Sequence, residues 1–303
     1  MNMKNSAARR IWHMLPMGIR HWIAKNVLDR VRIPFLHFQI KREINAFMRS
    51  EEPGYPSHIQ IETLNRCNGK CEFCAVNVHQ PQRPYAKMDE ALFKKIIMEL
   101  HNIDYDKGIA LFVFNEPFLD ERIVDWYRYT REMLPKAFIH VISNGTVLTI
   151  QKLEAIYPYL DRIEINNYDY EITPHIKELI DWKETNDNQN KVKISSRLRS
   201  EILSSIGGQS PNKKITKTIS SKCVLPYKQM AVRPDGKVSL CGCADPLGKM
   251  TLGDLSQSSI SQVWDSTEYR RIREIMKTKG RSGIALCKYC DYIDTLSNYI
   301  PPK

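Results

Sequence analysis

The chain has 303 residues, of which 42% are apolar and 26% are charged, and these proportions exclude an intrinsically disordered protein. No run reaches the roughly 18 apolar residues of a membrane-spanning helix, and the Arg-rich start lacks the apolar core of a secretory signal. We therefore expect a cytoplasmic protein. A chain of this length is expected to form two domains.

The formal net charge of +11 is concentrated in the first 50 residues, which hold ten basic and two acidic side chains. Apolar residues recur there at four-residue spacing from Ile19 to Val31. This pattern predicts an amphipathic helix from about Met17 to Arg32, which Pro34 ends. The helix could pack on the main domain, bind an anionic membrane surface or another anionic partner, or bind nucleic acid. The first interpretation is favoured, and nucleic acid is unlikely.

From residue 58 onward, short β-branched runs alternate with helical patterns. This alternation predicts a parallel sheet with right-handed crossovers, either open and doubly wound or closed into a barrel. The expected strands are 58–63, 109–114, 138–143, 162–167 and 191–196, and the expected helices are 89–102, 120–133, 149–158 and 174–184.

Polar or ligating groups follow four successive strands of this predicted sheet. The first strand runs into a cysteine-rich loop, and the next three are followed by Asn115-Glu116, Asn144-Gly145 and Asn166-Asn167. Because ligands gather at the carboxyl ends of parallel strands, we expect the functional site at this edge.

The C-terminal part of the chain has a different pattern. Residues 229–241 predict a β-hairpin that turns at 234–236, and residues 259–277 predict a single helix. We therefore divide the chain into a basic extension (1–52), a main β/α domain (53–206), a linker (207–222) and a small C-terminal domain (223–303). The expected buried face of the last helix is Ile260, Val263, Trp264, Ile272 and Ile275.

Eight cysteines in a cytoplasmic protein indicate metal ligands or catalytic thiols rather than disulfides. Cys67, Cys71 and Cys74 have a C-x3-C-x2-C spacing with no fourth cysteine in the loop. Three thiolates on a four-iron cluster leave one iron open to a small molecule. The alternative is a zinc site completed by His79, although this spacing is unusual for zinc.

The segment RCNGKCEFC (66–74) closely resembles the signature of the radical S-adenosylmethionine (radical SAM) family. The resemblance implies a partial (β/α)6 barrel whose first loop holds a [4Fe-4S] cluster, with SAM chelated to the open iron. An electron from an external donor then breaks a carbon–sulfur bond of SAM. The resulting 5'-deoxyadenosyl radical removes a hydrogen atom from the substrate, so the cofactor supplies the difficult chemistry.

The same resemblance implies which residues surround SAM. The segment FNEP (114–117) stands in the place of the family's Gly-Gly-Glu-Pro, so Glu116 is expected to accept a hydrogen bond from the SAM ammonium. Phe114 and Asn115 replace the two glycines and remove the close backbone approach that glycine allows. The other implied contacts are Phe73 beside the adenine, Ser143 and Asn144 after the third strand, Asn166 at the ribose, and Arg197 or Arg199 at the carboxylate.

A second cysteine group lies in the C-terminal domain. Its sequence, from CVLPYKQMAVRPDGKVSLCGCAD to LCKYCD, resembles a shortened SPASM (twitch) domain and implies a second [4Fe-4S] cluster; a four-cysteine zinc site is the alternative. Cys223, Cys287 and Cys290 are the implied ligands, and the family spacing favours Cys241 over Cys243 as the fourth. Cys243 would then be a free thiol, either buried and inert or a catalytic hydrogen donor to the substrate radical.

The function expected from these patterns is a radical SAM oxidoreductase or epimerase. Short members with one auxiliary cluster, an N-E-P loop and an R-x-R-x-E segment (197–201) resemble enzymes that modify sugars or aminocyclitols. A carbohydrate-type substrate is therefore the leading hypothesis. The alternatives are maturation of a ribosomally made peptide and, outside the enzymes, a zinc-stabilised binding module. The basic extension adds the hypothesis of an anionic or membrane-attached partner.

Overall fold

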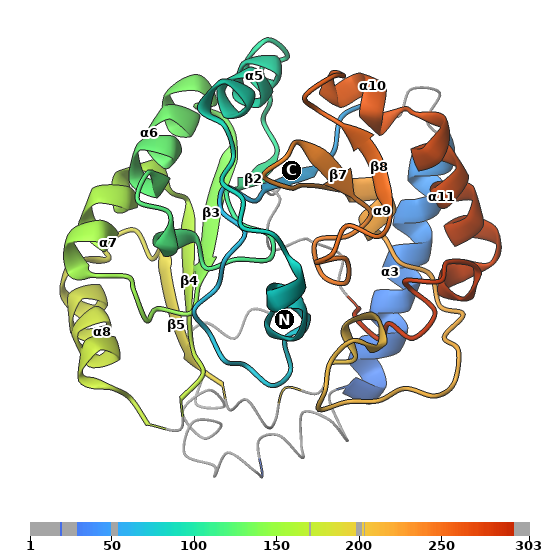
Figure 1. The fold of residues 1–303 in the computed structure, drawn as a ribbon. Coiled ribbons are helices and arrows are strands. Elements are labelled where there is room, and N and C mark those ends of the chain that lie inside the picture. Colours follow the sequence, from blue (N-terminus) through green and yellow to red (C-terminus); the bar gives the residue numbers. More distant parts are fainter. Residues whose placement is uncertain are drawn as a thin grey trace.

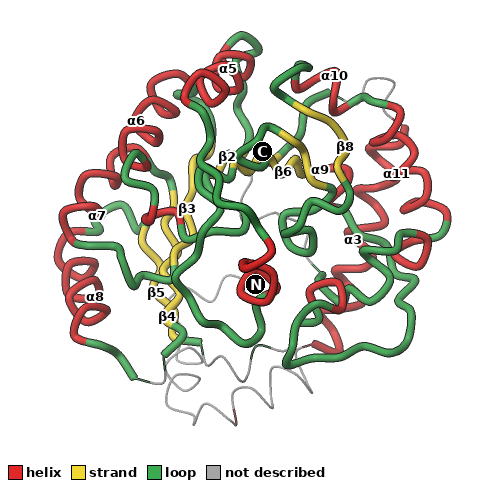
Figure 2. The backbone as a smooth tube through the Cα atoms, in the orientation of Figure 1, coloured by secondary structure: helices red, strands yellow, loops and turns green. Residues whose placement is uncertain are grey.

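The computed structural model describes residues 19, 29–49, 54–169, 171–197, 202 and 204–293. Its centre is a single curved sheet with the strand order β5-β4-β3-β2-β1-β6-β7-β8 (Figures 1 and 2). The strands are β1 (His58–Ile61), β2 (Gly108–Ala110), β3 (Phe138–Ser143), β4 (Arg162–Asn167), β5 (Val192–Ser196), β6 (Gln229–Val232), β7 (Lys237–Ser239) and β8 (Thr251–Asp254).

Strands β1 to β5 are parallel neighbours in chain order, which confirms the predicted β/α sheet. The helices that connect them lie on the outer side of the sheet (Figure 1). Each helix buries an apolar stripe against the sheet, and side-chain caps fix three of their starts at Asp89, Thr149 and Thr173. These helices are α5 (Glu90–His101), α6 (Ile123–Met133), α7 (Ile150–Ile156) and α8 (Pro174–Asn186).

The C-terminal segment continues the same sheet. Strand β6 pairs in parallel with the free edge of β1, and β7 and β8 follow as antiparallel strands. The predicted hairpin is confirmed: its turn contains Gly236 at φ +81°, a backbone conformation that favours glycine. The cysteine loop after β1 and the cysteines after β7 are therefore carried by one hydrogen-bonded sheet.

Helix α3 (Asp29–Arg49) differs from the prediction. The expected helix at 17–32 lies largely outside the described residues, and the prediction that Pro34 ends it is wrong because α3 continues through this proline. A proline inside a helix costs about 3 kcal/mol. Ile40 and Ile44 are almost completely buried, and burial of each contributes about 1.5–3 kcal/mol, which offsets that cost. Among the helices that the structure describes, none has the length and apolar character needed to cross a lipid bilayer.

The helix predicted over 259–277 is divided in two, so that prediction is also wrong. Helix α10 (Ile260–Trp264) ends before Asp265, and α11 (Thr267–Thr278) starts after Ser266, whose side chain accepts a hydrogen bond from the Tyr269 backbone N–H. This local cap competes with continuation of the helix. The predicted buried face is otherwise correct, except that Ile275 is half-buried.

Two histidines are buried side by side on the face of the sheet opposite the outer helices. His58 Nε2 on β1 lies 2.7 Å from His140 Nε2 on β3. The backbone N–H of Gly242 donates to Gln229 Oε1, so the Gln229 amide nitrogen faces and donates to His58 Nδ1. One of the two Nε2 atoms therefore donates a hydrogen bond to the other. This series of hydrogen bonds joins β3, β1 and β6 to the loop between Cys241 and Cys243.

These histidines predict a loss of stability in acid. Burial lowers the pKa of His58 to about 3 and lowers that of His140 well below its usual value. The unfolded chain therefore binds more protons below pH 6.5, and the free energy of unfolding should fall by about 2 kcal/mol per histidine between pH 6.5 and pH 5. Urea unfolding at both pH values should show this loss in the wild type and a smaller one in His58→Gln/His140→Gln. The exposed control His101→Gln should lose as much as the wild type, and equal losses in all three would contradict the prediction.

Candidate active site

The loop after β1 carries Cys67, Cys71 and Cys74, and it places the first two next to Gly69. A Cβ placed on Gly69 would lie 3.4 Å from Cys67 Sγ and 3.6 Å from Cys71 Sγ. The Gly69 N–H also donates to Cys67 Sγ over 3.3 Å. The Cys67 and Cys71 thiols therefore lie next to a residue with no side chain, and Cys74 is close enough to Cys67 for their charges to interact. Three cysteines of one loop fit an inorganic cluster.

The cysteines of this loop favour the protonated thiol, which is a poor metal ligand, until a cation stabilises the thiolate. Burial raises the pKa of Cys67 to about 12 and also raises the pKa of Cys74. At neutral pH such thiols keep their protons unless a positive charge stabilises the thiolates. Iron supplies that charge, so cluster binding should release protons.

A glutamine that the sequence analysis missed holds the first cysteine in place. Gln80, six residues after Cys74, accepts a hydrogen bond from the Cys67 N–H over 2.8 Å and donates to the Cys67 carbonyl over 3.0 Å. The side-chain amide thus binds the peptide groups on both sides of this Cα. Nothing in the local pattern marks Gln80, because the contact depends on how the loop folds back.

Replacement of Gln80 by leucine should weaken the first cluster without unfolding the protein. Loss of two partly buried hydrogen bonds corresponds to about 1–3 kcal/mol, or roughly tenfold faster release of iron from this loop to a chelator. The measurement is iron release under anaerobic conditions, with Gln82→Leu as the exposed neighbouring control. Equal release rates for both variants and the wild type would show that the Gln80 contacts do not hold the loop.

Glu116 joins the loop after β2 to the end of β3. Its Oε1 accepts from Ser143 Oγ over 2.7 Å, and its Oε2 accepts from the Asn144 N–H over 2.8 Å. Burial raises the pKa of Glu116, and these hydrogen bonds act in the opposite direction. The structure thus brings Glu116, Ser143 and Asn144 together as predicted from their places after neighbouring strands. The role of Glu116 as acceptor for the SAM ammonium remains a prediction.

Asn115, which replaces a glycine of the family pattern, offers an unused donor. Its Oδ1 accepts from the Val113 N–H over 3.0 Å, whereas its Nδ2 is buried with no hydrogen-bond partner among the described residues. An orphaned buried donor is costly, so a bound group that accepts from it would be favoured. This observation fits an occupied cofactor site beside Glu116.

An aromatic pair joins the cysteine loop to the residue that follows β4. The Phe73 and Tyr168 rings lie 5.3 Å apart at 54°, and burial raises the pKa of Tyr168 to about 12. Tyr168 directly follows β4, a position that the sequence analysis assigned to Asn166 alone. Asn166 is itself buried at the end of β4, and Arg197 after β5 is exposed with its N–H donating to Asn167. Arg199 lies outside the described residues.

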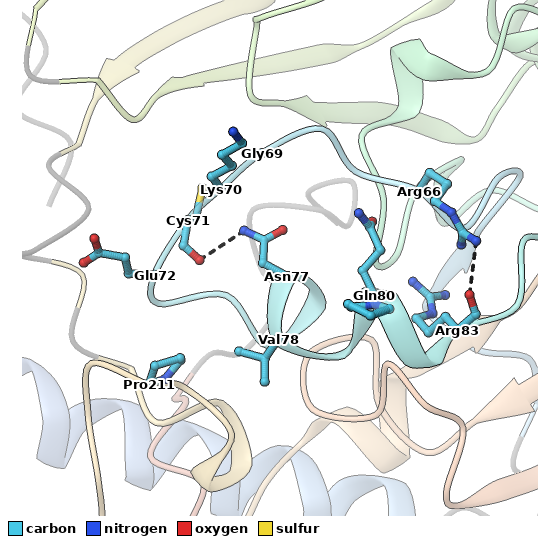
Figure 3. Close-up of a pocket in the computed structure, with 11 residues that line it drawn as sticks. Arg66, Gly69, Lys70, Cys71, Glu72, Asn77, Val78, Gln80, Arg83 and Pro211 are labelled. Carbon is cyan, nitrogen blue, oxygen red and sulfur yellow. Dashed lines mark hydrogen bonds between the residues drawn. The ribbon is translucent and has the colours of Figure 1, made fainter.

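A cavity of about 660 Å³ opens beside the cysteine loop (Figure 3). Its lining includes Cys71, the basic side chains of Arg66 and Lys70, the acidic Glu72, and Pro211 from the predicted linker. The volume is in the range of small-molecule sites, about 300–1,000 Å³. A polar ligand of sugar size would fit next to the first cluster loop.

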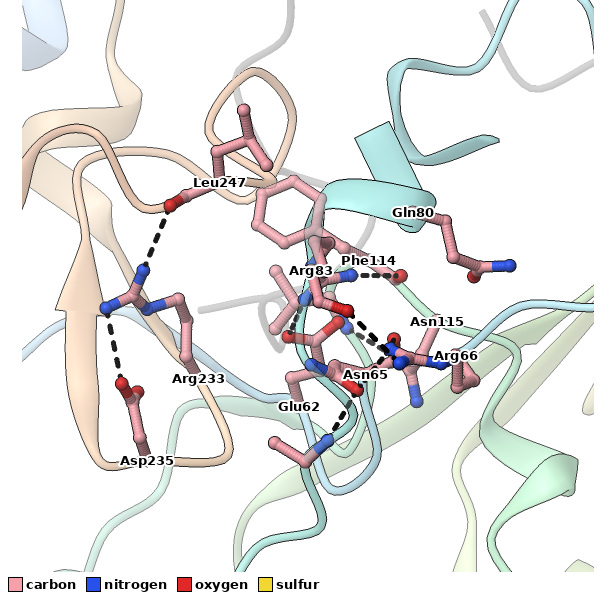
Figure 4. A network of polar contacts seen from close by, with 12 residues as sticks. Glu62, Asn65, Arg66, Gln80, Arg83, Phe114, Asn115, Arg233, Asp235 and Leu247 are labelled. Atoms are coloured by element: carbon pink, nitrogen blue, oxygen red, sulfur yellow. Dashed lines mark hydrogen bonds and ion pairs between the residues drawn. The ribbon is translucent and has the colours of Figure 1, made fainter. Parts of the chain in front are cut away.

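A buried ion pair supports the floor of this region (Figure 4). Arg83 Nη2 lies 2.6 Å from Glu62 Oε2 just beyond β1, and Arg83 Nη1 donates to the Phe114 carbonyl. Arg66 donates to the carbonyls of Asn65 and Arg83. Burial raises the pKa of Glu62, and Arg83 opposes that shift. The network fixes the loop after α4 (Ala75–His79) against the FNEP segment.

The C-terminal cysteines also meet in one place. One small apolar cavity next to the end of β7 is lined by all five of them: Cys223, Cys241, Cys243, Cys287 and Cys290. The Cys243 N–H donates to Cys241 Sγ over 3.2 Å, and both thiols face the cavity. The predicted auxiliary site is therefore assembled from residues up to 67 positions apart in the sequence. The choice of Cys241 over Cys243 as the fourth ligand remains a prediction.

Two family profiles match this chain. The radical SAM superfamily profile covers residues 61–183, and the profile of the SPASM iron-sulfur cluster-binding domain covers residues 223–291. The protein therefore belongs to the radical SAM enzymes with a C-terminal SPASM domain, and its cofactors are [4Fe-4S] clusters and SAM. Both matched domains bind iron-sulfur clusters, which argues against the zinc-stabilised binding module.

Individual relatives agree with this assignment. The S-adenosyl-L-methionine-dependent 2-deoxy-scyllo-inosamine dehydrogenase of Niallia circulans is 25% identical over 241 residues, covering 78% of this chain and 93% of that protein. The structure of BtrN in complex with AdoMet and 2-DOIA has a TM-score of 0.69 at 22% identity and covers 81% of this chain and 98% of BtrN. Streptococcus suis SuiB bound to its precursor peptide SuiA has a TM-score of 0.50 at 13% identity, covering 82% and 74% of the two chains. These similarities confirm the predicted fold class.

Proposed function

We propose that this protein is a cytoplasmic dehydrogenase that oxidises an alcohol carbon of an aminocyclitol or a related carbohydrate. The observation that carries the proposal is the similarity to the 2-deoxy-scyllo-inosamine dehydrogenase, which extends over 93% of that enzyme. The single auxiliary cysteine cavity supports it, because oxidation of an alcohol to a ketone requires an electron acceptor after the first hydrogen has left.

Different residues of the proposed active site would bind the first cluster, SAM and the substrate. Cys67, Cys71 and Cys74 would hold the first cluster, while Glu116 and Asn115 offer an acceptor and a donor to SAM. When bound, the first cluster and SAM supply the radical chemistry that removes a hydrogen atom from carbon. The cavity beside the loop would hold the substrate next to the first cluster.

The test is anaerobic incubation of the reconstituted enzyme with dithionite, SAM and 2-deoxy-scyllo-inosamine. Formation of 5'-deoxyadenosine and a ketone in equal amounts supports the proposal. Substrate-independent 5'-deoxyadenosine without any ketone would overturn the proposed substrate. An epimerised product that acquires deuterium from deuterated water, and is lost in Cys243→Ala, would show that Cys243 is a catalytic hydrogen donor. Turnover of a precursor peptide instead would indicate peptide maturation.

We also propose that the basic extension attaches the enzyme to an anionic membrane surface. Phe35 and Phe38 on α3 are 58% and 63% exposed, and Arg42 and Arg49 continue the same outward face at helical spacing. An exposed aromatic pair beside exposed basic side chains is typical of helices that lie at a lipid interface.

Replacement of both phenylalanines by serine should therefore weaken binding to phosphatidylglycerol vesicles by at least about tenfold, because less apolar surface enters the interface. Cosedimentation measures the effect. Ile172→Ser, which removes an exposed apolar residue from another part of the protein, is the matched control. Equal binding by the two variants, or equal binding to phosphatidylcholine vesicles, would exclude this role.

A further inference from the structure

Arg281 is a buried cation at the auxiliary cysteine cavity. Only 1% of its surface is exposed, and it lines the same cavity as the five C-terminal cysteines. Its guanidinium donates to Ser221 Oγ and to the Tyr292 carbonyl, and it also hydrogen-bonds the Cys223 thiol. In the described part of the chain, no ion pair joins Arg281 to a carboxylate.

A buried guanidinium needs an anion. Arginine keeps its charge under all ordinary conditions, and a charge removed from water costs several kcal/mol unless an opposite charge compensates it. The oxygen partners of Arg281, a hydroxyl and a carbonyl, are neutral. The cysteines of the cavity are the nearby groups that become negative when they ligate iron.

The cavity places this charge among the expected ligands. Cys223, Cys241, Cys287 and Cys290 line the same small apolar cavity as the buried Arg281. The guanidinium is therefore positioned to stabilise negative charge on a cluster held by these ligands.

The backbone fixes Arg281 in this position. Gly280, directly before it, has φ +63°, and a Cβ there would lie 2.0 Å from the Ser220 carbonyl oxygen. The Arg281 N–H donates to the Ser221 carbonyl over 3.2 Å. This close approach places the arginine next to the segment that leads into Cys223, so its charge cannot move away from the cavity without breaking the packing.

We propose that Arg281 is a positioning residue that raises the reduction potential of the auxiliary cluster. A four-iron cluster with four thiolates becomes more negative when it gains one electron, so a fixed buried positive charge favours the reduced form. Oxidation of an alcohol to a ketone removes one hydrogen atom, one proton and one electron. With a higher potential, the auxiliary cluster accepts this electron more readily during turnover, and this consequence rests on the proposed function. The effect of Arg281 on the reduction potential is independent of the substrate.

The experiment measures the midpoint potential of the auxiliary cluster in the full chain with Cys67, Cys71 and Cys74 replaced by alanine, so that one cluster remains. Arg281→Met should shift the oxidised-to-reduced ratio at a fixed potential by at least about tenfold, a decrease of about 59 mV for a one-electron couple. Arg281→Lys, which keeps a cation, should remain close to the wild type. The exposed Arg270→Met on α11 is the matched control and should show no shift.

Each outcome decides the proposal. A lower potential in the methionine variant but not in the lysine variant supports it. If the methionine variant does not bind the cluster while the lysine variant does, the requirement for positive charge is also supported. Equal potentials in all loaded variants overturn it. Equal decreases of the reduction potential in both Arg281 variants would also overturn the proposal, as would loss of the cluster from both. In either case Arg281 would act through its shape and not through its charge. A failed dehydrogenase assay alongside the expected potentials would reject only the proposed substrate reaction.

Discussion

Replacement of Cys71 by alanine should abolish formation of 5'-deoxyadenosine from SAM. Cys71 lies beside Cys67 next to Gly69, and a cluster that lacks one of its three protein ligands should not remain bound to this loop. The iron content should fall from about eight to about four atoms per chain, because the auxiliary site is unchanged. Anaerobic iron analysis and chromatographic detection of the nucleoside measure both effects.

A matched control for this experiment is Glu72→Ala, which changes an exposed residue of the same loop that carries no thiol. This variant should retain about eight irons per chain. Iron content is the readout for this control, because Glu72 also lines the proposed substrate cavity. If Cys71→Ala kept about eight irons per chain and still cleaved SAM, the first cluster would lie elsewhere and the proposed active site would be wrong.

Replacement of Cys290 by alanine should have a different effect, which separates the two cysteine sites. Cys290 is 8% exposed and lines the cavity of the auxiliary site. Its loss should remove the auxiliary cluster while the loop after β1 remains intact. We expect SAM cleavage to continue, whereas the amount of ketone formed per 5'-deoxyadenosine falls by about a hundredfold or more, because the substrate radical loses its electron acceptor.

The ratio of the two products is the informative quantity in this second experiment. Equal losses of nucleoside and ketone would indicate that the C-terminal segment had unfolded, which circular dichroism would reveal. A folded variant should keep about four irons per chain. A folded variant with an unchanged product ratio would show that the auxiliary site takes no part in the oxidation.

Much of the sheet could be predicted from local patterns. Residues 138–143 and 162–167 are strands with the predicted bounds, since their β-branched runs are bounded by turn residues. The break between α10 and α11 was missed because Ser266 acts as a cap within a pattern that is otherwise continuous. The passage of α3 through Pro34 was missed because tertiary burial of Ile40 and Ile44 decides it.

Some residues of the candidate site could likewise be predicted from local patterns, and others could not. Glu116, Ser143 and Asn144 were predicted because each directly follows a strand, so their proximity follows from the order of the sheet. Gln80 and Tyr168 act through contacts across 13 and 95 positions of the chain. Arg281 contacts Ser221 across 60 positions. No periodicity or motif marks such residues, since their partners are fixed by the complete fold.

The pairing of β6 with β1 should allow the connection through residues 207–222 to vary in length. Strand β1 leads into Cys67 and the β6–β7 hairpin leads into Cys241, so interstrand hydrogen bonds set the separation of the two iron-binding regions. The intervening covalent connection through 207–222 does not set it. Relatives could therefore lengthen or shorten this connection, for example at the exposed residues 216–218, while the two cysteine sites keep the same separation.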